Sequence, residues 1–111
     1  MTHDQTIAQD LVDAGVLEAK RAAESPLSNV LSSALGASEA RPVVSTMTVK
    51  RGCAMVLCTD GLIKHVSDEE IAAHLRTATS SEQACRALVD LALERGGTDN
   101  VTVLIGRAPA R

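Results

Sequence analysis

The spacing of apolar positions predicts helices in the first third of the chain. Ile7, Leu11 and Val12 fall at helical spacing; Asp4 can cap this helix and Gly15 ends it. The stretch "LEAKRAAES", residues 17–25, predicts a second, short helix that closes before a proline. A third helix is predicted because five apolar residues mark one of its faces. These are Leu27, Val30, Leu31, Ala34 and Leu35. Gly36 is the predicted C-terminal end of this helix.

Two strands are predicted to follow. Residues 42–50, "PVVSTMTVK", are rich in β-branched side chains and partly alternate. Residues 53–58, "CAMVLC", are apolar at every position, which is typical of a strand buried on both faces. Since "KRG" can turn the chain between them, we expect these strands to form a β-hairpin.

A helical hairpin and a last strand complete the pattern. Ser67 and Glu70 form a capping box ahead of a helix with Ile71 and Leu75 on one face. "SSEQ" opens a longer helix that Gly96 and Gly97 end, and "NVTVLIG", residues 100–106, reads as the last strand. The inward positions of the longer helix are Ala84, Leu88, Leu91 and Ala92. The pattern predicts an α+β fold, with a helical segment over 1–36 and the hairpin, two helices and last strand over 42–107.

Composition limits what this fold can do. The 111 residues suffice for one small domain, but the chain has no aromatic residue, so its core must be thin or part of something larger. A net charge of −3 gives no case for binding nucleic acid, and no apolar stretch approaches the ~20 residues of a membrane span. With no signal-peptide pattern, and with cysteines 53, 58 and 85 interpreted as small core residues, we expect a cytoplasmic protein.

Two aspartates stand at the ends of predicted strands. Asp60 follows the strand 53–58, and Asp99 precedes the last strand. If these strands are antiparallel neighbours, both acids lie at the same edge of the sheet, with Gly61 and Gly97 leaving room for an ion or substrate. Paired carboxylates suit Mg²⁺ or Mn²⁺, although Asp-Gly and Thr-Asp-Asn are also common turn sequences. Two carboxylates are too few for a two-metal hydrolytic site.

Four segments in order resemble the metal-dependent protein serine/threonine phosphatases of the PP2C (PPM) family. They are "THDQTIAQDLVDAG", "NVLSSALG", "MVLCTDGLIKHVSDEEI" and "ALERGGTDNVTVLI". The resemblance covers nearly the whole chain and corresponds to the C-terminal half of the family's domain. It implies part of an antiparallel β-sandwich flanked by helices, and two Mg²⁺ or Mn²⁺ ions that activate a water for attack on a phosphoryl group.

The resemblance also assigns residues. Asp60 and Asp99 match the family's ligands of one metal ion, and Asp4 matches an aspartate that helps hold a third, weaker ion in some relatives. Thr59, Gly61, Gly97 and Asn100 would support the two principal ligands. The substrate implied is a phosphorylated protein.

The chain departs from the family in two respects. Gln5 stands where the family has a histidine, and the family's first half, which carries a bridging aspartate and a phosphate-gripping arginine, is missing. We therefore expect a bacterial phosphatase fragment that is inactive alone and prone to dimerise through exposed strands. The alternatives are a non-catalytic PP2C-like binding or regulatory module, or an unrelated α+β domain in which both acids lie in turns.

Overall fold

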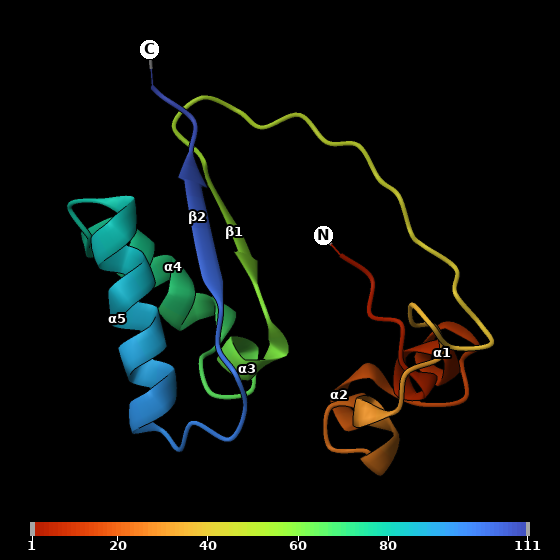
Figure 1. Ribbon diagram of the computed structural model, residues 1–111. Helices are drawn as coiled ribbons and strands as arrows, with labels where there is room; N and C mark the ends of the chain where they lie inside the picture. Colours follow the sequence, from red (N-terminus) through yellow and green to blue (C-terminus); the bar gives the residue numbers. More distant parts are fainter. Residues whose placement is uncertain (1, 111) are drawn as a thin grey trace. The chain divides into compact units, whose positions relative to one another are not determined.

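The structure is a computed structural model that describes residues 2–110, and these form two compact units that meet between Thr46 and Met47 in the sequence. In the first, Figure 1 shows the short helices α1 (Ile7–Asp13) and α2 (Ala19–Ala22), and a 3-10 turn covers Pro26–Asn29. The predicted first two helices are thus present. No helix in the described part of the chain is long and apolar enough to cross a membrane.

The cap of α1 is a correction to the sequence analysis. Thr6, rather than Asp4, precedes the helix, and its hydroxyl accepts a hydrogen bond from the Gln9 N–H at 3.1 Å. A threonine two residues later in the chain therefore satisfies one of the free N–H groups of the first turn. Gly15 has a φ of +76°, consistent with its predicted role at the end of the helix.

The predicted third helix is wrong. Only the 3-10 turn forms, Val30 is extended, and Leu31 pairs with Thr6 in an isolated antiparallel bridge. The Ile7 N–H donates to the Val30 carbonyl at 2.8 Å. These backbone groups are thus paired across the unit instead of within a helix, and Leu35 of the predicted apolar face is 98% exposed.

The predicted hairpin is also wrong. Residues 42–50 form no strand, and they appear in Figure 1 as an extended connection. Strand β1 (Ala54–Cys58) pairs antiparallel with β2 (Val103–Arg107), with Val56 opposite Ile105. A β-branched composition favours a strand only where a neighbouring strand is available for pairing. Residues 42–50 lack such a neighbour, because β1 pairs with β2, which lies 45 or more residues later in the sequence.

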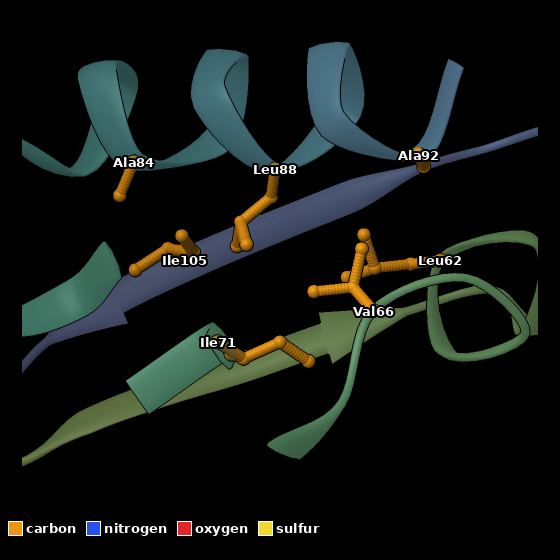
Figure 2. Packing of buried hydrophobic residues seen from close by; sticks show 7 residues of the cluster. All are labelled: Leu62, Val66, Ile71, Ala84, Leu88, Ala92 and Ile105. Atoms are coloured by element: carbon orange, nitrogen blue, oxygen red, sulfur yellow. The ribbon is translucent and has the colours of Figure 1, made fainter. Parts of the chain in front are cut away.

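The core of the second unit lies between this two-stranded sheet and three helices (Figure 2). The helices are α3 (Asp60–Ile63), α4 (Asp68–Thr77) and α5 (Ser81–Glu94). Figure 2 shows Leu88 of α5 above Ile105 of β2, with Leu62 and Val66 nearby. The complete buried cluster is Leu62, Val66, Ile71, Ala84, Leu88, Ala92 and Ile105.

The helix signals of this unit are confirmed. Ser67 and Glu70 form the predicted capping box, and Gly96 and Gly97 end α5 with positive φ values of +131° and +51°. The inward face predicted for α5 is correct, because Ala84, Leu88 and Ala92 are buried and Leu91 packs against them.

Burial on both faces of β1 is not observed. Leu57 and Cys58 are exposed, as is Cys53, so only Cys85 fits the prediction of cysteines packed in the core. A two-stranded sheet with helices on one face has an uncovered opposite face, which an apolar sequence alone does not reveal.

Candidate metal site

The antiparallel pairing brings the two predicted acids to the same end of the sheet. Cys58, the last residue of β1, lies opposite Val103, the first residue of β2. Asp60 follows as the first residue of α3, and Asp99 lies in the loop that leads into β2. The prediction that the strands flanking these two acids are antiparallel neighbours is confirmed, although the acids themselves lie just beyond the strand ends.

Thr59 joins the two segments that carry the acids. Its N–H donates to the Thr102 carbonyl at 3.1 Å, and its hydroxyl accepts from the Thr102 N–H at 3.0 Å. The same hydroxyl donates to the carbonyl of Asn100 at 3.2 Å. Thr59 precedes α3, but its side chain does not cap the helix, because its hydroxyl bonds to Asn100 and Thr102 instead. These bonds hold the residue before Asp60 against the residue after Asp99.

The role predicted for the glycines needs correction. A Cβ atom on Gly61 would lie 2.1 Å from the Asn100 carbonyl oxygen, so the space beside Gly61 is filled by protein backbone and not left for an ion. Gly97 has a φ of +51°, and a Cβ there would lie 3.2 Å from the Leu93 side chain. Gly61 permits close packing of the two segments, and Gly97 permits the chain to leave α5.

A lysine that the sequence analysis did not consider lies between the two acids. Lys64 Nζ is 3.4 Å from Asp60 Oδ2 and 3.3 Å from Asp99 Oδ2. The i,i+4 spacing of Asp60 and Lys64 was the available sequence signal, since residues four apart are neighbours on a helix. Both carboxylates therefore converge on a single positive charge.

This arrangement shifts the pKa values of Lys64 and Asp99. The pKa of Lys64 is raised, mainly by the hydrogen bond that Lys64 donates to Asp99 and next by its hydrogen bond to Asp60. The pKa of Asp99 is lowered, first by the hydrogen bond from the Asn100 N–H at 2.7 Å and then by Lys64. Asp99 is thus a carboxylate at neutral pH, as a metal ligand must be.

A second network fixes the loop before Asp99. Arg95, which follows α5, donates to the two Glu70 carboxylate oxygens at 2.7 and 2.5 Å and to the His65 carbonyl at 2.8 Å. The His65 ring contacts the Thr98 hydroxyl at 2.8 Å through Nε2. The Arg95 hydrogen bonds are the main cause that lowers the pKa of Glu70 to about 2.

The acid pair fits a divalent cation as part of its ligand set. Carboxylate oxygens are the donors that Mg²⁺ and Mn²⁺ prefer, and the two side chains are accessible, with 63% of Asp60 and 42% of Asp99 exposed. Among residues 2–110, no group of three or more His, Cys, Asp or Glu side chains is placed to hold a metal. Asp60 and Asp99 would therefore supply two ligands, and water or other groups the rest.

Asp4, the predicted weaker ligand, belongs to the first unit. It is exposed and lies two residues before Thr6. A hollow of about 410 Å³ in that unit is lined by residues that include Ile7, Asp10 and Leu31, but not Asp4. The assignment of Asp4 as a ligand stays a prediction.

Known proteins are similar to this chain in sequence and fold. The family model "Protein phosphatase 2C" matches residues 32–101. The serine/threonine protein phosphatase PstP of Mycobacterium tuberculosis is 38% identical over 105 residues, which are 95% of this chain and 20% of PstP. A crystal structure of M. tuberculosis PstP matches with a TM-score of 0.87 and 34% identity, covering 98% of this chain and 46% of that one.

A further structure bears on the metal. The catalytic domain of PstP in complex with two manganese ions matches with a TM-score of 0.75 and 36% identity, over 95% of this chain and 43% of that one. The chain spans less than half the length of the PstP sequence and of the chain in each of the two PstP structures.

The mixed helices and strands and the antiparallel pair match the fold of solved PP2C-type phosphatases. The chain belongs to the protein phosphatase 2C family. The resemblance drawn from the sequence is therefore confirmed, and the alternative of an unrelated α+β domain is wrong.

Proposed function

We propose that this chain supplies Asp60 and Asp99 as ligands of one divalent ion in a PP2C-type protein phosphatase site. The reaction of the complete site would be hydrolysis of phosphoserine or phosphothreonine in a phosphorylated protein. The single observation that carries this proposal is the convergence of both carboxylates on one positive charge. Membership of a family in which the catalytic domain of PstP binds two manganese ions supports the identity of the ion.

The residues of this chain would hold and position the ion. When bound, Mg²⁺ or Mn²⁺ supplies an activated water for attack on phosphorus. Asp60 and Asp99 provide negative oxygen ligands, and Thr59 keeps their backbone segments at a fixed separation. Asp4 would contribute to a weaker third ion.

This set is half of a two-metal site. Such a site holds its ions ~3.5–4 Å apart and needs a bridging ligand. Two carboxylates do not meet that requirement, and among residues 2–110 no larger ligand group is assembled. We therefore propose that the chain alone does not turn over substrate, and that residues outside this sequence complete the site.

A second candidate function is a non-catalytic binding or regulatory module. The observation in its favour is that Lys64 already neutralises part of the charge of Asp60 and Asp99. A module of this kind would keep the fold and the acid pair without binding a divalent ion.

Reconstitution separates these two functions. The purified chain is mixed with a separately expressed polypeptide that carries the first half of a PP2C domain, and release of phosphate from a phosphothreonine peptide is followed with Mn²⁺. We expect no turnover by either piece alone and measurable turnover by the mixture. Asp60→Asn and Asp99→Asn should abolish it, whereas Asp90→Asn, at an exposed position on α5, should not.

Turnover that is equal in all three variants would contradict the role of the acid pair. Failure of the mixture to react, although the two pieces form a complex, together with no binding of Mn²⁺ by the chain, would favour the binding module.

A further inference from the structure

Lys64 is held in place from two directions. Its N–H donates to the Asp60 carbonyl at 3.0 Å, which fixes the backbone at the end of α3. Its side chain extends back over this short helix to both carboxylates. The ammonium group is therefore at the place to which the oxygens of Asp60 and Asp99 both point.

We propose that the Lys64 ammonium is a built-in counter-ion of the acid pair, which a divalent ion must displace before it binds Asp60 and Asp99. This inference rests on the proposed function, because it concerns the same two ligands. It adds a residue that sets the affinity of the site and that is not itself a ligand.

Charge and geometry both support displacement. The three groups together carry one net negative charge, whereas the two carboxylates alone carry two. A divalent ion that approached with the ammonium still in place would be repelled by a positive charge a few ångströms away, and at this range the interaction is strong. Coordination and the lysine ion pairs therefore compete for the same oxygens.

The lysine side chain has room to leave. It is 39% exposed, and its four-carbon stem has several rotatable bonds. The backbone of Lys64 need not move, because its hydrogen bond to the Asp60 carbonyl does not involve the side chain. Metal binding would then release the amine into solvent while α3 stays formed.

The test compares Lys64→Met, which keeps the length of the side chain without its charge, with Lys50→Met at an exposed lysine of the same unit. Mn²⁺ affinity of the full chain is measured by electron paramagnetic resonance. We expect Lys64→Met to bind about tenfold more tightly than the unmodified chain, the order of effect for loss of one nearby like charge. Lys50→Met should leave the affinity unchanged.

Two readouts address Lys64 without reference to affinity. In the metal-free chain, Lys64→Met should lower the thermal midpoint, because the two carboxylates then face each other unneutralised, and Mn²⁺ should restore it. Acetylation of amines, quantified by mass spectrometry, should become faster at Lys64 as Mg²⁺ is added and stay constant at Lys50.

The outcomes distinguish the two proposals. Mn²⁺ binding that depends on Asp60 and Asp99 but is equal in the unmodified chain and Lys64→Met would overturn the counter-ion role and leave the metal site standing. Acetylation of Lys64 that does not respond to saturating Mg²⁺ would also overturn it. Absence of binding in both proteins would overturn the metal site itself, whereas binding by Lys64→Met alone would support the counter-ion role.

Discussion

Gly61 and Asn100 are in backbone contact, and a Cβ atom on Gly61 would lie 2.1 Å from the Asn100 carbonyl oxygen. The two nearest atoms that such a group would meet are the carbonyl oxygen and carbon of Asn100, which belong to the main chain and cannot rotate away as a side chain could. The contact therefore sets how closely the segment that begins with Asp60 approaches the segment that follows Asp99.

Gly61→Ala should therefore separate the two segments. We expect it to lower the free energy of unfolding by about 1–3 kcal/mol, the usual range for an added methyl group without space, as measured by urea denaturation. Gly106→Ala is the matched control, since a Cβ there meets nothing within 4 Å. Equal stability of the two variants would contradict the described contact.

Thr59→Val should weaken the join between the same segments while keeping the side-chain shape. The valine loses the hydrogen bonds to Asn100 and Thr102. Because these groups are exposed, water replaces part of the loss, and we expect a decrease of about 1 kcal/mol in urea denaturation. Thr102→Val should change stability less, because Thr102 bonds to Thr59 through its backbone and not through its hydroxyl. A larger loss of stability in Thr102→Val than in Thr59→Val would argue against the described hydrogen bonds of Thr59.

Glu70 should make the second unit sensitive to acid. The pKa of Glu70 is lowered from its ordinary value of 4.5 to about 2 in the folded chain. The charged carboxylate therefore stabilises the folded state relative to the unfolded state. The stabilisation is fully present above pH 4.5 and is lost as the pH falls from there toward 2. Urea midpoints measured across this range should fall less steeply for Glu70→Gln than for the unmodified chain.

Glu69→Gln is the control for this experiment, because Glu69 lies in the same helical turn and is exposed. Its pH profile should match that of the unmodified chain. A Glu70→Gln profile that follows the same curve would show that the contacts with Arg95 and Ser67 do not stabilise the fold.

The uncovered face of the sheet predicts self-association. Leu57 and Leu104 lie opposite each other in the two strands, and they are 55% and 63% exposed. Exposed apolar strands with open edges favour pairing with another chain. We expect sedimentation to show a dimer at micromolar concentration and Leu104→Glu to shift it toward monomer. A compact monomer at all concentrations would contradict this prediction.

Local signals in the sequence were sufficient for helices α4 and α5 of the second unit. The capping box at Ser67 and Glu70 and the glycines after α5 act through bonds and angles within a few residues, so the pattern specifies them. The placement of Asp60 and Asp99 followed from one further assumption, that β1 and the last strand are antiparallel neighbours.

The errors came from interactions that short-range patterns do not contain. Residues 42–50 have the composition of a strand, but β1 pairs with β2 instead. In place of the predicted third helix, the structure has a β-bridge between Leu31 and Thr6. Lys64 was overlooked for a related reason, because its contact with Asp99 spans 35 residues and only its spacing from Asp60 was visible.

Binding of Mn²⁺ by the purified chain tests the central claim most directly. Electron paramagnetic resonance titrations would compare the unmodified chain with Asp60→Asn, Asp99→Asn and the control Asp90→Asn. We predict weak binding of one ion, retained in Asp90→Asn and lost in each of the other two variants. Binding that survives both Asp60→Asn and Asp99→Asn, or no binding by either the unmodified chain or Lys64→Met, would contradict a metal site at this end of the sheet.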